Sequence, residues 1–233
     1  MKPKICVPLP AGRLSDLAPM IRRAEDSGAD LIEIRLDYPR VGPLRALDEL
    51  TKVIKQASVP FIATNRQYQQ GGLRPQDEKR RIEVLVSAAN IGFQFVDIEL
   101  TSADLRLTVQ RVKDCGAKPI VSHHDLEGTP SESEMERIVR SEIEAGAEVC
   151  KLVTTAKLVD DNIRCLVFTQ RLSQVTNIVC FAMGWKGLLS RAFSPFFGGY
   201  FTFASLDDGL ETAPGQLSIA DLERIYRTLG VIE

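Results

Sequence analysis

Residues 31–37 read Leu-Ile-Glu-Ile-Arg-Leu-Asp, an alternation of apolar and charged side chains with a period of two. Successive side chains of a β-strand point to opposite faces, so the apolar residues share one face and Glu33, Arg35 and Asp37 share the other. If helices cover the apolar face, the three charges point into the middle of a barrel. Unpaired buried charge is costly, so these residues form a structural ion-pair layer or bind a ligand. Asp97 and Glu99 repeat the pattern, and there the structural interpretation is favoured.

Short apolar runs recur along the whole chain and alternate with longer amphipathic stretches, which is typical of β-α repeats with a parallel sheet. Residues 1–233 contain no linker, and their number is close to the ~250 residues of one α/β barrel. No glycine-rich dinucleotide fingerprint or phosphate loop follows a run, which disfavours an open sheet. The sequence therefore predicts a single (β/α)8 barrel over residues 1–233. The predicted strands are Lys4–Leu9, Leu31–Leu36, Phe61–Thr64, Phe95–Glu99, Pro119–Ser122, Glu148–Val153, Asn177–Ala182 and Tyr200–Ala204.

Residues that favour helix ends mark several of the segments between these strands. The predicted helices include one from Ser15 to Gly28, one from Ser131 (with Glu134 completing a capping box) to Gly146, one from Ser218 (with Asp221) to Gly230, and the short segment Leu188–Phe193.

The composition narrows the class of protein. Lys and Arg total 29 against 31 acidic residues, and this lack of a basic excess disfavours a nucleic-acid-binding protein. No uncharged run is long and apolar enough to predict a membrane span or a signal peptide. The cysteines are odd in number and lack C-x-x-C spacing, so disulfides and a zinc site are not expected. Free cysteines suit a reducing compartment, and we therefore expect a cytoplasmic location. They are Cys6, Cys115, Cys150, Cys165 and Cys180.

Lys151 lies in an apolar run, Val149–Val153, that otherwise suits a fully buried strand. Burial penalises the charged form of lysine, and Arg35 or Arg66 nearby would add to this, which would free the amine to attack a carbonyl. A lysine that reaches solvent or pairs with a carboxylate fits the position equally well.

His123 and His124 are the only histidines and end the strand before that of Lys151. Adjacent strand residues point to opposite sides, so at most one of them faces the barrel interior. A histidine there, beside a buried lysine, is well placed for general acid–base catalysis.

Loops after three predicted strands carry further polar residues. Arg66 follows the third strand, Arg191 follows the seventh, and Thr212 to Gln216 follow the eighth. Arginine suits a bidentate grip on a carboxylate, and the glycines in these loops allow close backbone approach. Nearby aromatic residues are expected to lie in the core or at a subunit contact; they are Phe193, Phe196, Phe197, Tyr200, Phe201 and Phe203.

Taken together, these motifs resemble the type I 3-dehydroquinate dehydratases over essentially the whole chain, and their order and spacing make the resemblance specific. The matching motifs are Glu33-Ile-Arg35-Leu-Asp37, Asn65-Arg66 with Gly71-Gly72, Ser122-His-His124-Asp125, the Lys151 strand, Met183-Gly-Trp-Lys-Gly-Leu-Leu-Ser-Arg191 and Ala213-Pro-Gly-Gln216.

The resemblance implies a hydro-lyase that forms an imine between Lys151 and the ketone of 3-dehydroquinate, with His124 moving the protons and no metal or organic cofactor. It also implies a homodimer that serves aromatic amino acid biosynthesis. Arg191 would hold the substrate carboxylate, and the residues expected to grip its ring and hydroxyls are Glu33, Arg35, Arg66, Thr212 and Gln216.

Two positions depart from the family pattern. Gln70 stands where the family commonly has a glutamate that supports the histidine, and Pro8 stands where some members have serine. Two other functions remain open: a lysine-imine aldolase of sugar phosphates, and a barrel that binds a metabolite without catalysis. The first would need a phosphate site after strands seven and eight, and Gln70 favours the second.

Overall fold

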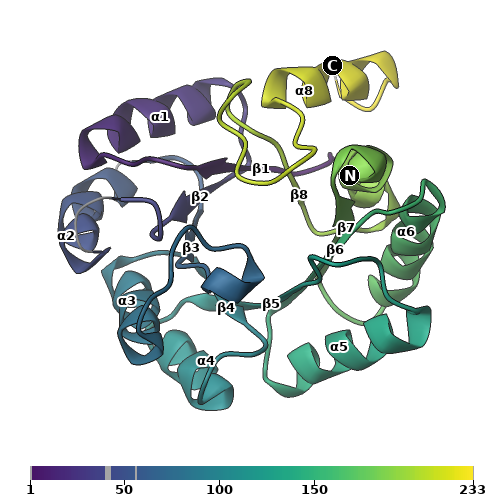
Figure 1. Ribbon diagram of the computed structural model, residues 1–233. Helices are drawn as coiled ribbons and strands as arrows, with labels where there is room; N and C mark the ends of the chain where they lie inside the picture. The colour runs from purple at the N-terminus through teal and green to yellow at the C-terminus, as the bar shows by residue number, and fades with distance from the viewer. Residues whose placement is uncertain (1, 40–42, 56, 233) are drawn as a thin grey trace.

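The computed structural model describes residues 2–39, 43–55 and 57–232, and its eight parallel strands curl into a barrel (Figure 1). Their order in the sheet is β7-β6-β5-β4-β3-β2-β1-β8, which confirms the predicted barrel. The strands are β1 (Ile5–Leu9), β2 (Leu31–Arg35), β3 (Phe61–Thr64), β4 (Phe95–Glu99), β5 (Lys118–His124), β6 (Val149–Thr155), β7 (Ile178–Met183) and β8 (Thr202–Phe203).

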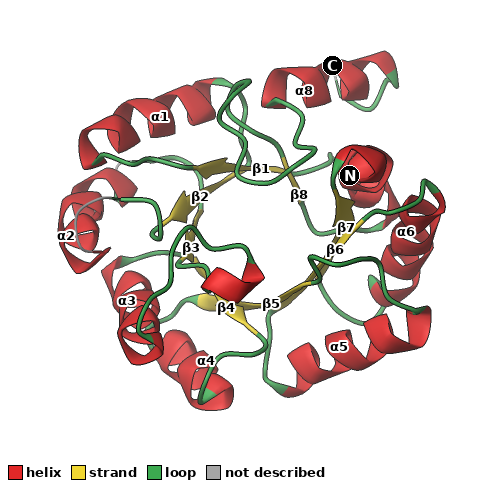
Figure 2. Ribbon diagram, viewed as in Figure 1, coloured by secondary structure: helices red, strands yellow, loops and turns green. Residues whose placement is uncertain are grey.

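Helices form a ring outside the strands (Figure 2). Within the described residues, none of them is long and apolar enough to cross a membrane. The α-helices are α1 (Leu14–Asp26), α2 (Pro43–Ile54), α3 (Glu78–Ile91), α4 (Leu105–Asp114), α5 (Glu132–Glu144), α6 (Asp160–Leu172), α7 (Leu188–Phe193) and α8 (Ile219–Thr228). The described residues also form the short 3-10 helices η1 (Tyr68–Gln70), η2 (Trp185–Gly187) and η3 (Ser194–Phe197).

The barrel closes less regularly between β7 and β8 than elsewhere. Strand β8 pairs with β1 through Ile5–Thr202 and Cys6–Phe203. On its other side, the Tyr200 amide donates a 2.7 Å hydrogen bond to the Ile178 carbonyl, and the described residues show no strand pairing beyond it. The predicted strand Tyr200–Ala204 is therefore shorter in the structure, because its first residues bridge to β7 without forming a ladder.

Side chains that point into the barrel are stacked in layers, as the period of two predicts. The alternate side chains Ile32, Ile34 and Leu36 point outward and join the core beneath the helices, as expected. The interior side chains nearest the amino ends of the strands are apolar, namely Cys6, Leu31, Ile62, Phe95, Ile120, Val149, Val179 and Phe201. Two residues further along their strands, several interior side chains are buried but polar, and these include Glu33, Thr64, Asp97, Ser122 and Lys151. Charged residues are thus confined to the upper half of the barrel.

Two of the predicted helix caps are confirmed and one is wrong. The Ser131 and Ser218 hydroxyls accept hydrogen bonds from the amides three residues on. Helix α1 already begins at Leu14, so Ser15 lies inside it, and its hydroxyl donates to the Asp16 carboxylate instead of capping the helix.

Candidate active site

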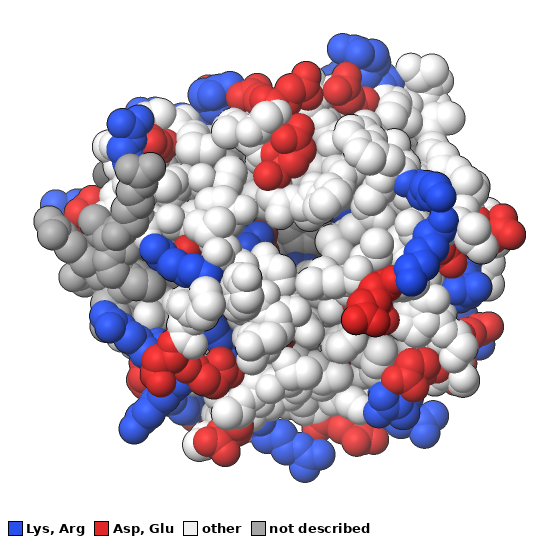
Figure 3. Space-filling model, viewed as in Figure 1, with Lys and Arg blue, Asp and Glu red and all other residues white. Residues whose placement is uncertain are grey.

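The predicted site residues border a single pocket at the carboxyl ends of the strands. The cavity measures about 290 Å³. Figure 3 shows its mouth as a hollow with basic groups visible inside it and mostly uncharged residues around it. All eight predicted residues line it: Glu33, Arg35, Arg66, His124, Lys151, Arg191, Thr212 and Gln216.

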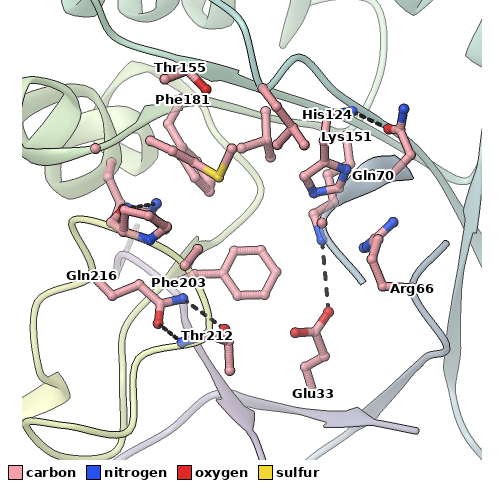
Figure 4. Close-up of a pocket in the computed structure, with 18 of the residues that line it drawn as sticks. Glu33, Arg66, Gln70, His124, Lys151, Thr155, Phe181, Phe203, Thr212 and Gln216 are labelled. Atoms are coloured by element: carbon pink, nitrogen blue, oxygen red, sulfur yellow. Dashed lines mark hydrogen bonds and ion pairs between the residues drawn. The ribbon is translucent and has the colours of Figure 1, made fainter. Parts of the chain in front are cut away.

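Lys151 lies at the bottom of this pocket and is 4% exposed. Its Nζ is 2.8 Å from Asp97 Oδ2. The same nitrogen is 3.8 Å from Glu33 Oε1, the ion pair that Figure 4 marks with a dashed line. The same nitrogen lies 4.5 Å from the centre of the Phe203 ring. Both interpretations of the sequence therefore hold in part: the lysine is buried, and it is paired with carboxylates.

Asp97 has a larger part in the site than the sequence indicated. Besides Lys151, it accepts hydrogen bonds from Arg66 Nη2 at 2.7 Å and from the Ser122 hydroxyl at 2.6 Å. Burial alone would raise the pKa of Asp97, but Arg66 and Lys151 hold it well below its usual range. The purely structural interpretation of Asp97 was incomplete, although its inward position on β4 follows from the same period of two that marked Glu33.

Arg66 and Arg35 are each fixed by carboxylates of the chain. Arg66 Nη1 donates to Glu99 at 2.9 Å and to the Ser122 hydroxyl at 2.8 Å. Arg35 forms a two-bond pair with Asp37, at 2.9 and 2.7 Å. Of the three charges that the sequence left unassigned, Arg35 and Asp37 therefore pair with each other, whereas Glu33 pairs with Lys151. Arg35 still borders the pocket.

The two histidines point to opposite sides of β5, as predicted, and only His124 lines the pocket. Burial, with Arg66 and Lys151 nearby, lowers the pKa of His124 well below its usual value. Its buried Nδ1 has no hydrogen-bond partner among the described residues. A neutral imidazole in this position can accept a proton from a bound molecule.

Gln70, in η1, also lines the pocket. Its side-chain oxygen accepts a 2.7 Å hydrogen bond from the backbone amide of His124, which Figure 4 shows as a dashed line. Gln70 thus supports the histidine through the main chain and holds the end of β5.

Arg191, in α7, is buried and is not paired with a carboxylate in the described part of the chain. Its Nη2 donates to the Pro214 carbonyl at 3.3 Å, its guanidinium lies 4.5 Å from the Phe181 ring centre, and its Nε has no partner. Burial lowers the pKa of Arg191 to about 9. A buried cation left in this state is suited to binding an anion.

The loop between β8 and α8 covers one side of the pocket. Thr212 and Gln216 bond to each other, through Gln216 Nε2 to Thr212 Oγ1 at 3.2 Å and Thr212 N to Gln216 Oε1 at 2.8 Å. The Pro214 carbonyl accepts a bond from the Gly184 amide at 3.1 Å. Gly215 has a φ of +72°, and a Cβ there would lie 2.5 Å from the Gly184 carbonyl oxygen, so only glycine allows this contact.

An apolar wall completes the pocket and was not predicted. Phe203 lies in the core, as expected, and also lines the cavity. The position of Val153 and Thr155 could have been predicted, because they follow Lys151 at intervals of two along β6. The apolar side chains of this wall are Leu126, Val153, Phe181, Met183, Phe203 and Pro214.

Comparison with known proteins agrees with the motifs. A family model described as type I 3-dehydroquinase matches residues 5–233. The 3-dehydroquinate dehydratase of Dehalococcoides mccartyi strain BAV1 is 37% identical over 206 residues, which cover 88% of this chain and 89% of that protein. The chloroplastic bifunctional 3-dehydroquinate dehydratase/shikimate dehydrogenase of Arabidopsis thaliana is 34% identical over 95% of this chain, which spans only 36% of that longer protein.

A solved structure supports the fold. The crystal structure of 3-dehydroquinate dehydratase from Geobacillus kaustophilus superposes with a TM-score of 0.90 at 23% identity, covering 100% of this chain and 93% of that one.

Proposed function

This chain belongs to the type I 3-dehydroquinase family, and from that premise we propose that it dehydrates 3-dehydroquinate to 3-dehydroshikimate, in the shikimate pathway, through an imine on Lys151. The observation that carries the proposal is a buried Arg191, with no carboxylate partner in the described part of the chain, in one pocket with Lys151 and His124. This combination suits an anionic ketone, because Arg191 can bind the carboxylate while the lysine attacks the carbonyl.

In the first step, the nitrogen of Lys151 bonds to the C3 carbonyl carbon, and two protons of its ammonium group pass to the carbonyl oxygen. This oxygen leaves as water, which gives a protonated imine. The new cationic nitrogen takes the place of the ammonium between Asp97 and Glu33. The charge of the buried cluster is therefore the same before and after the step, which avoids the cost of an unpaired buried carboxylate.

In the second step, the neutral His124 removes the proton from C2, and the electron pair moves through C2–C3 into the imine to give an enamine. When the pair returns, the C1 hydroxyl leaves, takes the proton from His124 and departs as water. A second water molecule then hydrolyses the imine, which releases the product ketone and restores Lys151. The protonated imine acts as the electron sink, so this sequence uses no metal or organic cofactor.

The remaining pocket residues would orient the ring so that its C2 proton faces His124. Arg35 and Arg66 are already bonded to carboxylates of the chain, so each presents a fixed edge of its guanidinium to the substrate hydroxyls. Glu33, Thr212 and Gln216 supply further hydrogen-bonding groups around the same cavity.

The proposal is tested by incubating the protein with 3-dehydroquinate and borohydride, which reduces an imine to a stable amine. We expect intact mass to rise by one reduced adduct per chain, and peptide mapping to place it on Lys151. Lys151→Met should form no adduct, whereas Lys157→Met, which removes an exposed lysine, should form it normally. Folded wild-type protein that forms no adduct would favour a binding-only barrel or a different ketone.

We also propose that the chain is a cytoplasmic homodimer. Support for the dimer comes from an apolar surface formed by the residues just before α6, by α6 itself and by the η2–α7 segment that contacts α6. Its side chains are 47% to 76% exposed. Large exposed apolar surfaces of this kind mark sites of association. We call it the α6 surface and define it by Leu158, Val159, Ile163, Val167, Trp185 and Leu189. All five cysteines are free, which suits a reducing compartment.

A further inference from the structure

Besides the three arginines that line the pocket, a fourth lies behind it. Arg81, in α3, is 1% exposed. Its Nη1 donates to Glu99 Oε2 at 2.6 Å and to the Asn65 carbonyl at 2.9 Å. Its other nitrogens bond to both oxygens of Glu78 and to the Ser102 hydroxyl. Every nitrogen of this guanidinium therefore donates a hydrogen bond within the chain, which fixes the orientation of the group.

Glu99 connects Arg81 to the pocket. It is fully buried and lies between two guanidinium groups, with Oε1 facing Arg66 Nη1 at 2.9 Å and Oε2 facing Arg81 Nη1 at 2.6 Å. A buried carboxylate needs this much compensation, since a lone anion would be costly at this depth. Because Arg81 compensates the charge at Oε2 of Glu99, Arg66 has to compensate it only at Oε1.

Arg66 is consequently shared between two carboxylates. One of its Nη atoms serves Glu99 and the other lies 2.7 Å from Asp97 Oδ2. The same Asp97 oxygen is 2.8 Å from Lys151 Nζ. Asp97 thus divides its charge between Arg66 and Lys151, and any shift of Arg66 toward Glu99 would leave Lys151 as the remaining cation on that oxygen.

Resting on the function proposed above, we infer that Arg81 is a positioning residue: through Glu99 it holds Arg66 on Asp97 and so leaves Lys151 free to attack the substrate ketone. Without the charge of Arg81, Arg66 turns toward the under-compensated Glu99. Asp97 then binds the Lys151 ammonium alone and more tightly, and formation of the imine slows. The contact of Arg81 with the Asn65 carbonyl acts in the same direction, because it fixes the main chain next to Arg66.

The experiment compares Arg81→Met with wild type by the rate at which borohydride traps the imine. We expect this rate to fall on the order of tenfold, as is usual for groups in one ion-pair network. If deprotonation at C2 limits turnover in the wild type, substrate deuterated at C2 should give a smaller isotope effect on kcat in Arg81→Met, because imine formation becomes limiting. If the substitution only reduced the amount of folded enzyme, activity would fall but the isotope effect on kcat would not change.

Three further variants make the test specific. Arg81→Lys keeps a positive charge toward Glu99 and should recover part of the trapping rate. Glu78→Gln removes the negative charge of the outer partner of Arg81. The Glu78 side chain is 31% exposed, so this variant should leave the trapping rate within about twofold of wild type. The double variant Arg81→Met/Glu99→Gln also serves if the single variant does not fold, because it removes the buried anion together with its partner, and it should trap faster than Arg81→Met.

A crystal structure of Arg81→Met separates failure of this inference from failure of the proposed function. The inference predicts that Arg66 leaves Asp97 for Glu99. Unchanged Arg66 geometry with an unchanged trapping rate would overturn it, even if the wild-type protein forms the imine normally. Wild-type protein that forms no imine would overturn the proposed function, and the position of Arg66 would still decide whether Arg81 positions it.

Discussion

Gln70 adds no charge beside the group that moves the protons. Its oxygen holds the amide of His124, and the imidazole has a lowered pKa because of burial and two nearby cations. A carboxylate at this position can accept the same hydrogen bond, and it adds a negative charge that favours the imidazolium. The residue therefore offers a way to shift the protonation of His124 with little change in geometry.

We predict that Gln70→Glu stays active and that the acid limb of its pH profile for kcat/KM moves up by about one unit. The sign follows from the role of His124 as a base: activity is lost as pH falls through its pKa, so a raised pKa brings the loss at a higher pH. Gln69→Glu places the same charge on the exposed neighbouring side chain and should shift the limb much less. Identical profiles for Gln70→Glu and wild type would contradict this account.

At the scale of residues, the period of two was the most informative feature of the sequence. It placed Glu33 and Arg35 in the barrel interior, and the structure confirms those positions. It could not assign partners, because a partner on another strand depends on register and on side-chain conformation. Asp97 was undervalued for that reason, and Arg81 was missed because it reaches the cluster from a helix.

Helix α5 places a buried carboxyl group, that of Glu142, where the helix packs on β6. The side chain is fully buried, and neither carboxyl oxygen meets a donor at hydrogen-bonding geometry, although the Cys150 thiol and the Lys151 amide lie beside it. Burial raises the pKa of Glu142 well above its usual value. The protonated form is therefore favoured in the folded protein, and ionisation at higher pH costs stability.

We predict that Glu142→Met raises the free energy of unfolding by about 1–3 kcal/mol at pH 8, because it removes a buried polar group without hydrogen bonds. For a carboxyl whose folded pKa is raised, the stabilising contribution is complete below the unfolded pKa and is lost as pH rises through the folded pKa. The gain from the substitution should therefore shrink toward pH 4. Urea unfolding at both pH values checks this, with the exposed Glu144→Met as control, and a gain that does not depend on pH would rule out the titration.

The elements themselves were predicted well where the signal is local. The segment Leu188–Phe193 is a helix with those bounds, and the serine caps at 131 and 218 are present. The cap expected at Ser15 failed because the N-cap of helix α1 is Arg13, two residues earlier. Ser15 therefore lies inside the first turn, and its hydroxyl donates to the Asp16 carboxylate. Strand β8 was overestimated, since its length depends on pairing with a distant strand.

At the scale of the whole molecule, the α6 surface is the feature that the barrel fold does not explain. Helix α6 needs only one apolar face to pack on the barrel, yet Ile163 and Val167 are 59% and 51% exposed on the other. If a second copy covers this surface about a two-fold axis, the same side chains are buried on both subunits of the dimer.

We predict that Ile163→Glu shifts the protein from dimer to monomer in sedimentation velocity at micromolar concentration, because two carboxylates would meet in an apolar contact. Leu107→Glu, on α4 and 61% exposed, introduces the same change away from the surface and should leave the sedimentation coefficient unaltered. A wild-type protein that sediments as a monomer would refute the proposed dimer, and an Ile163→Glu variant that stays dimeric would place the contact elsewhere.

The barrel as a whole was predictable because the alternation of strands and helices runs through the chain and leaves few arrangements that bury every apolar face. The seam between β7 and β8 was not predictable, since it depends on how the last two strands meet after all the others are in place. Beside β7 the described residues hold this seam by the single hydrogen bond from Tyr200 to Ile178.

That seam has a consequence for motion. Local opening costs least free energy where the fewest hydrogen bonds join neighbouring strands. The barrel should therefore open more often between β7 and β8 than between β5 and β6. Helix α7 lies in the connection across this line and carries Arg191. An anion bound to Arg191 would tie the two sides together, and hydrogen exchange along the seam would then report how tightly the substrate is held.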